Sequence, residues 1–153
     1  MLLFQTDSLI INPGIERFIK YDYVGAPWHQ QNERWNAIVA QVPSAVGNGG
    51  FSLRTVSVMK EIAKQHGHSS GPTEQEDIFY AARVFKNHAL SPRSIAYDFC
   101  LEVPCDDLLP GPEGPFAVHA AWYYNPVPVV QELLYQSLTT ALCSNCSRTH
   151  TTR

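Results

Sequence analysis

The sequence has little charge and no excess of basic residues. Only 16% of its 153 residues are charged, and 11 Lys and Arg stand against 14 Asp and Glu, for a formal net charge of −3. Proteins that bind nucleic acid neutralise phosphates with clustered Lys and Arg. The charge balance therefore argues against nucleic acid as a partner, and no basic run indicates binding to an anionic membrane surface.

The sequence also lacks a long apolar run. No stretch reaches the roughly 18 residues that a membrane-spanning helix needs. The N-terminal segment has no basic region and places Asp7 early, unlike a signal peptide. We therefore expect no membrane span and, by default, a cytoplasmic location. The length and the 44% of apolar residues are typical of one folded domain.

Cysteine is scarce, and we expect no disulfide framework. The four cysteines are Cys100, Cys105, Cys143 and Cys146. Without a secretory signal, free thiols are expected. Cys143 and Cys146 form a C-x-x-C motif with His150 nearby, but a structural zinc site needs four ligands. A zinc site completed by Cys105 remains an alternative to our interpretation of residues 143–153 as a disordered tail.

Short apolar runs alternate with segments of helical periodicity, which predicts an α/β fold. The run Leu2–Thr6 is typical of a buried parallel strand, with Asp7 at its carboxyl end. Helices are expected from about Thr55 to Gly67, over Glu74–Lys86 and over residues 126–142. We expect a mixed, mostly parallel sheet flanked by helices.

Four places in the sequence carry candidate functional side chains, and each also has a purely structural explanation. They are Asp7, the glycine-rich turn at residues 47–50, the pair Glu76-Asp77, and His119 with Trp122. Aspartate is common in turns, glycine serves tight turns, and acids stabilise helix N-termini. A histidine or tryptophan is often a core residue. It is the order of the four along the chain that favours a functional interpretation.

That order resembles the GT-A-type glycosyltransferases, and most closely a glycosyltransferase-like family catalogued as a domain of unknown function. The matching segments are FQTDSLI (Phe4–Ile10), YDYVGAPW (Tyr21–Trp28), VGNGGFSLR (Val46–Arg54), the pair Glu76-Asp77, and a G-x-H-x-x-W-like segment at Phe116–Trp122. The last has Ala117 where the family pattern tends to have glycine. The resemblance covers roughly residues 2–124, and VGNGGFSLR is its most specific part.

The resemblance implies an incomplete GT-A-like (Rossmann-like) fold that transfers a sugar from a nucleotide-sugar donor to a glycan or other hydroxyl acceptor. Residues 1–125 would form its acceptor-side part, and the βα units that bind the nucleotide would be missing before Asp7. An exposed sheet edge left in this way predicts self-association. The alternative is a non-catalytic remnant of the fold that binds carbohydrate or protein.

The resemblance also implies roles for the candidate residues. Asp7 and His119 would bind a divalent cation, most simply Mn²⁺, although Gln5 replaces the first aspartate of the Asp-x-Asp motif. The substrate sugars would contact Asn48, Gly49, Gly50 and Trp122. In an inverting enzyme a carboxylate must accept the proton of the acceptor hydroxyl. Asp77 is the first candidate for this base and Glu76 the second, and the stereochemistry stays open.

Overall fold

The computed structural model of the chain describes residues 1–28, 42, 44–67, 74–103, 111–124 and 126–148. Its elements form the mixed α/β architecture that the sequence predicts. The strands are β1 (Leu2–Phe4), β2 (Ser8–Ile10), β3 (Tyr23–Gly25), β4 (Phe51–Arg54), β5 (Cys100–Leu101) and β6 (Ala117–His119). The helices are the 3-10 turn η1 (Ile15–Arg17), α2 (Val56–His66), α3 (Glu76–Asn87), α4 (Arg93–Phe99), α5 (Ala121–Tyr124) and α6 (Val127–Arg148).

The described strands form two small sheets, ordered β1-β4-β3 and β2-β6-β5. In the first sheet both pairings are antiparallel, and Leu53 of β4 lies opposite Leu2 on one side and Val24 on the other. In the second sheet β2 is antiparallel to β6, whereas β5 runs parallel to it. The α/β class is confirmed, but the described strands do not form the mostly parallel sheet that we expected.

The observed sheets differ from the expected one already at the first strand, β1. We interpreted its apolar run as a buried parallel strand, but β1 is an edge strand of an antiparallel sheet, and Phe4 is 67% exposed. A tight turn follows, in which the Ser8 amide donates to the Gln5 carbonyl (3.1 Å), and the chain passes directly into the other sheet. Hydrophobicity over so few residues does not distinguish an edge strand from a buried one.

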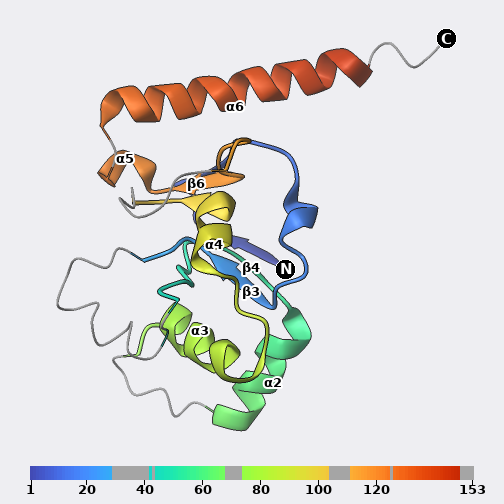
Figure 1. Cartoon of the computed structure of the whole chain (residues 1–153), viewed down its shortest axis with the longest axis vertical. Coiled ribbons are helices and arrows are strands. Elements are labelled where there is room, and N and C mark those ends of the chain that lie inside the picture. Colours follow the sequence, from blue (N-terminus) through green and yellow to red (C-terminus); the bar gives the residue numbers. More distant parts are fainter. Residues whose placement is uncertain (29–41, 43, 68–73, 104–110, 125, 149–153) are drawn as a thin grey trace.

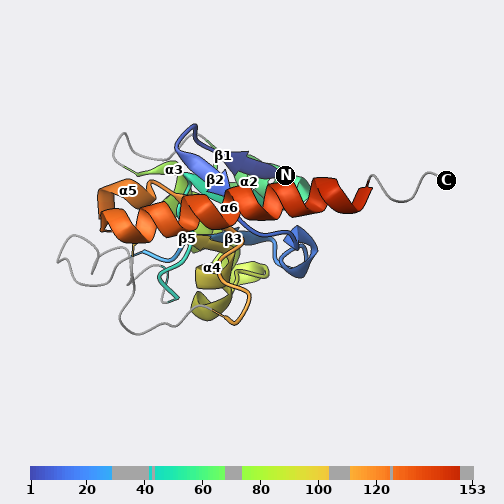
Figure 2. The same cartoon turned by 90° about the horizontal axis from the view of Figure 1, so that it is seen from above.

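The elements are stacked along the long axis of the molecule (Figure 1). Helix α6 lies at one end over β6, the strands β3 and β4 lie in the middle, and α2 and α3 cover the opposite end. Seen from above, α6 crosses the molecule and its C-terminal end extends past the sheets (Figure 2).

Four phenylalanines connect the two sheets. Phe18, Phe51, Phe99 and Phe116 are buried, and in five pairs of these rings the centroids lie between 5.0 and 6.1 Å apart. Such aromatic contacts stabilise beyond the area that they bury. Because Phe51 begins β4 and Phe116 precedes β6, this cluster fixes the glycine-rich turn before β4 relative to the histidine at the end of β6.

Helices α2 and α3 were predicted from the sequence and are confirmed. Helix α2 follows Thr55 and ends at His66, and the next residue, Gly67, has a positive φ of 57° that favours glycine. Both helices pack through Met59, Ile62 and Phe79 on the buried Tyr23 of β3. This packing presents the first turn of α3, with Glu76 and Asp77, to the glycine-rich turn.

Helix α6 begins at Val127, where a helix was expected, and continues to Arg148 through part of the segment interpreted as a disordered tail. Leu133 packs on Ile11, Val118 and Ala121, and the Ser137 hydroxyl donates to the Ile10 carbonyl (3.1 Å). Among the described residues we find no helix with the length and apolar character that crossing a membrane requires.

Candidate functional site

Three of the four predicted places meet around one polar cavity of about 330 Å³. The first turn of α3, the glycine-rich turn and the end of β6 line it, together with Gln5 from the β1–β2 turn. Its lining residues are Gln5, Asn48, Gly49, Gly50, Gln75, Glu76, Asp77 and His119. The fold thus brings together side chains that lie far apart in the sequence.

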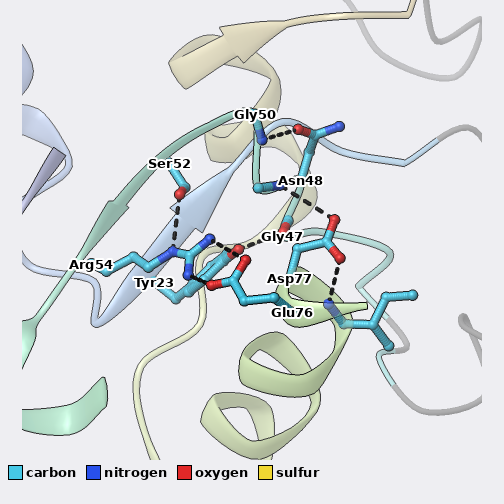
Figure 3. Close-up of polar contacts among 10 residues, drawn as sticks. Tyr23, Gly47, Asn48, Gly50, Ser52, Arg54, Glu76 and Asp77 are labelled. Carbon is cyan, nitrogen blue, oxygen red and sulfur yellow. Dashed lines mark hydrogen bonds and ion pairs between the residues drawn. The ribbon is translucent and has the colours of Figure 1, made fainter. Parts of the chain in front are cut away.

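The glycine-rich turn is held by hydrogen bonds to its own backbone and to neighbouring side chains (Figure 3). The buried Tyr23 hydroxyl donates to the Gly47 carbonyl (2.5 Å). The Asn48 side chain accepts from the Gly50 amide (2.7 Å) and donates to the Glu102 carboxylate. Asn48 was expected to bind a sugar, but here both ends of its amide have partners within the protein.

The glycines of this turn are needed for packing inside the protein. A Cβ atom built on Gly50 would overlap the His119 imidazole, and one built on Gly49 would lie 3.1 Å from the Asp77 Cβ. A Cβ on Gly47 would lie 2.6 Å from the Ala81 Cβ, and its φ of 135° disfavours other residues. The absent side chains therefore let the turn approach both β6 and α3.

The two acids at the start of α3 lie in different surroundings. Glu76 forms a two-point ion pair with Arg54, in which Arg54 Nη1 donates to Oε1 and Nη2 to Oε2, the latter at 3.3 Å (Figure 3). The Glu76 side chain is 58% exposed, whereas that of Arg54 is 2% exposed. The Arg54 guanidinium also donates to Ser52 Oγ (3.0 Å) and lies over the Tyr23 ring (4.5 Å).

The second acid, Asp77, points towards the glycine-rich turn. Its carboxylate accepts from the Gly49 amide (3.3 Å) and from the Ile78 amide (2.8 Å). Burial raises the pKa of the Asp77 carboxyl above its ordinary value, and these backbone donors offset only part of the effect. Asp77 thus accepts protons more readily than an ordinary aspartate.

His119 lies between oxygen atoms on both sides of its ring. Its Nε2 is 3.1 Å from Gln5 Oε1 and 3.4 Å from Asp7 Oδ1, and its Nδ1 is 3.5 Å from Glu102 Oε1. Burial lowers the pKa of the imidazole, but the Glu102 and Asp7 carboxylates outweigh this effect and raise it above 6.5. Asp7 Oδ1 and His119 Nδ1 are buried without a hydrogen bond.

Three donor atoms lie together around His119 Nε2, and their chemistry is compatible with a divalent cation. Gln5 Oε1 and Asp7 Oδ1 are both hydrogen-bond acceptors facing the same ring nitrogen, and Asp7 Oδ1 has no hydrogen-bond donor. Two oxygens and one imidazole nitrogen suit Mn²⁺. Over the described part of the chain no three His, Cys, Asp or Glu side chains are arranged to bind a metal, so a cation site here would depend on the Gln5 amide oxygen as its third donor.

Two predicted site residues, Asp7 and Trp122, do not belong to the cavity lining. Asp7 lies beside His119, as described above, whereas Trp122 is more remote from the other candidates in the fold. Trp122 lies on α5, 49% exposed, with its ring 6.1 Å from that of Tyr123. The zinc alternative involves Cys105 and His150, which fall outside the described residues, as do the side chains of Cys143 and Cys146.

Sequence reasoning missed Arg54 and Glu102. Each carried a usable signal. Arg54 ends the apolar strand of the VGNGGFSLR segment, and a charge in such a strand requires a partner. Glu102 is an acid directly after a buried strand, the same pattern that drew attention to Asp7.

A family profile described as "Protein of unknown function (DUF5672)" matches residues 1–119, which include every residue that lines the cavity. No curated protein and no solved structure matches the chain.

Proposed function

The chain belongs to the DUF5672 family of proteins of unknown function, and on this premise we propose that it is a glycosyltransferase-like protein. It transfers a sugar from a nucleotide-sugar donor to a hydroxyl acceptor in the cavity between α3, the glycine-rich turn and β6. In this proposal the two sheets form the acceptor-side part of an incomplete GT-A-like, Rossmann-like fold.

The main support for the proposal is that the two adjacent carboxylates, Glu76 and Asp77, have different partners. Glu76 is paired with the buried Arg54 guanidinium, so its charge is compensated and its position is fixed. Asp77 lines the same cavity, is oriented by the Gly49 amide, and has a raised pKa. A general base works best when its pKa is shifted towards the working pH. We therefore assign the base to Asp77 and a supporting electrostatic role to Glu76.

The reaction assigned to this base is a direct displacement. Asp77 accepts the proton of the acceptor hydroxyl while the hydroxyl oxygen bonds to the anomeric carbon of the donor sugar. The bond from that carbon to the diphosphate oxygen breaks, and the nucleoside diphosphate leaves. Displacement from the face opposite the leaving group inverts the anomeric configuration, so the configuration of the product tests the assignment.

Gln5, Asp7 and His119 would bind the divalent cation, with the amide oxygen of Gln5 in place of the first aspartate of the motif. When bound, the cation neutralises the negative charge that develops on the diphosphate leaving group. The Gly49 and Gly50 backbone lines the cavity, and the exposed indole of Trp122, outside this lining, offers a face for stacking against a sugar.

The test uses the purified chain with UDP and GDP, with and without Mn²⁺, followed by turnover of a panel of nucleotide sugars. Asp77→Asn should retain nucleotide binding and lose at least about 100-fold in turnover, because a general base contributes at least that much. Glu61→Gln on the exposed face of α2 is the matched control and should behave as wild type.

Wild-type turnover by Asp77→Asn would exclude the base. A folded chain that neither binds nor turns over any nucleotide sugar would exclude the transferase. Glycan binding without turnover, unchanged in Asp7→Ala, would favour the non-catalytic binding module instead.

A further inference from the structure

We infer that the acceptor is an uncharged polyol, such as a neutral sugar, and that Gln75 is the side chain that selects it. Gln75 lies directly before the two acids that open α3, and no motif in the sequence indicated it. The inference rests on the proposed function, because Gln75 lines the same cavity as the base Asp77.

The side of the cavity formed by α3 is acidic. Glu76 and Asp77 both line it, and among the described residues no lysine or arginine does. The Arg54 side chain is 2% exposed and already paired with Glu76, so it is not open to an anion in the cavity. Like charges placed side by side strongly disfavour binding. An acceptor that carries a phosphate, sulfate or carboxylate would therefore be rejected here.

The N-terminus of α3 does not offset this negative charge for a ligand. The free amides at the start of a helix attract anions. Here the Asp77 carboxylate accepts from the Ile78 amide (2.8 Å) and also from the Gly49 amide (3.3 Å), so the protein's own acid occupies that place. A carboxylate only accepts hydrogen bonds when it is ionised, which suits the O–H donors of a polyol.

Gln75 occupies a position where a shorter side chain would stabilise the helix. It is the N-cap residue of α3, with φ of −67° and ψ of 144°, and its side chain makes no capping hydrogen bond. Short polar residues are preferred at this position because they accept from amides of the first helical turn. Gln75 is instead exposed and lines the cavity. Its amide can both donate to a hydroxyl and accept from one, which an ionised acid cannot do.

Consecutive residues thus divide the recognition of a polyol between them. In the proposed reaction Asp77 takes the proton of the reacting hydroxyl, and the Gln75 amide contacts a second hydroxyl of the same acceptor. An ammonium group would bind to the carboxylates without needing this amide. Dependence on Gln75 therefore distinguishes a neutral polyol from an amine.

The experiment titrates the full chain with methyl glycosides and follows the NMR shifts of its backbone amides. The glycosides of glucose, galactose and mannose are the neutral probes, those of glucuronic and galacturonic acid are the acidic probes, and that of glucosamine is the amine. The variant is Gln75→Ser. Gln65→Ser is the matched control, because Gln65 is an exposed glutamine of α2 that does not line the cavity.

We expect a neutral glycoside to bind and the acidic ones to bind at least about tenfold more weakly. Gln75→Ser should weaken the neutral binding about three- to tenfold, which is the effect of one hydrogen bond. The same variant should lower the equilibrium constant of unfolding in urea about two- to fivefold, because serine can cap α3. A purely structural role for Gln75 would not combine weaker binding with a more stable fold. The control should leave the binding unchanged.

Two further readouts separate charge from hydrogen bonding. Asp77→Asn, tested by binding alone, should reduce the discrimination against the acidic glycosides, because one of the two carboxylates is gone. In a chain that transfers sugar, Gln75→Ser should raise the KM for the neutral acceptor by more than it lowers kcat.

Acidic glycosides that bind as tightly as neutral ones overturn the inference, and so does neutral binding that is the same in Gln75→Ser. The inference also fails if glucosamine binds most tightly and independently of Gln75, or if a folded chain binds none of the probes. If Gln75→Ser does not fold, Gln75→Ala, which also removes the amide, takes its place.

Failure of the inference and failure of the proposed function give different results. Gln75-dependent binding of a neutral glycoside in a chain that transfers no sugar would uphold the role of Gln75 and refute the transferase. Sugar transfer that Gln75→Ser does not weaken would uphold the transferase and refute the role of Gln75.

Discussion

Replacing Arg54 by methionine should destabilise the fold by about 2–4 kcal/mol. The guanidinium is buried and engages four partners: Glu76, Ser52 and the rings of Tyr23 and Tyr80. Methionine retains an apolar side chain that fills part of the same space but offers none of these contacts.

The expected loss of stability is the sum of the contributions of the four partners of Arg54. The ion pair contributes at most about 1 kcal/mol, because more than half of the Glu76 side chain is exposed and water screens it. The hydrogen bond to Ser52 contributes about 1 kcal/mol. The two aromatic contacts, at 4.5 and 5.7 Å from the ring centroids, contribute about 1–2 kcal/mol together, because the charge is desolvated.

Urea unfolding followed by tryptophan fluorescence measures the loss, with an unchanged m-value as the check that the folded state is the same. Arg17→Met is the matched control, because Arg17 also forms an ion pair and lies 5.2 Å from a ring, but at the surface. Its loss should stay below about 1 kcal/mol. A loss for Arg54→Met no larger than that of the control would refute the reasoning.

Three further predictions concern the turn and α3. Gly50→Ala should lose about 1–3 kcal/mol by urea unfolding through overlap with His119, and His119→Ala in the same chain should restore part of it. Tyr23→Phe leaves the Gly47 carbonyl without its buried donor and should lose about 1–2 kcal/mol in the same assay. The folded state raises the pKa of Asp77, so the proton binds more tightly in the folded than in the unfolded chain. The free energy of unfolding of the wild type, relative to that of Asp77→Asn, should therefore be greatest below pH 3.8 and fall as the pH rises through the higher pKa of the folded state. A difference in stability that does not change with pH would contradict this prediction.

The helices were predictable because they depend on local signals. Thr55, Gly67 and the acids that open α3 mark helix ends within a few residues, and the apolar positions between them follow the helical period. Strand pairing depends on segments far apart in the chain. The run at Leu2–Phe4 therefore predicted a strand correctly but not its edge position or its antiparallel neighbour.

Residues of the candidate site were predictable where a polar side chain follows or ends an apolar strand segment. Asp7 and His119 stood out as polar residues at strand ends, and the structure brings them within 3.4 Å of each other. The contacts of these residues with their neighbours were not predictable in this way. Glu102 faces His119 only because β5 pairs with β6 in parallel, and no spacing within the sequence indicates that pairing.

The VGNGGFSLR segment acts as a connector between the two carboxylates of α3 and the histidine of β6. Its glycines admit Asp77 on one side and His119 on the other, and its arginine binds Glu76. A larger side chain at position 50 would displace the imidazole, and loss of Arg54 would leave Glu76 to compete with Asp77 as a second uncompensated acid. The segment therefore places the two neighbouring acids in different surroundings, which is what the proposed transfer with a single base requires.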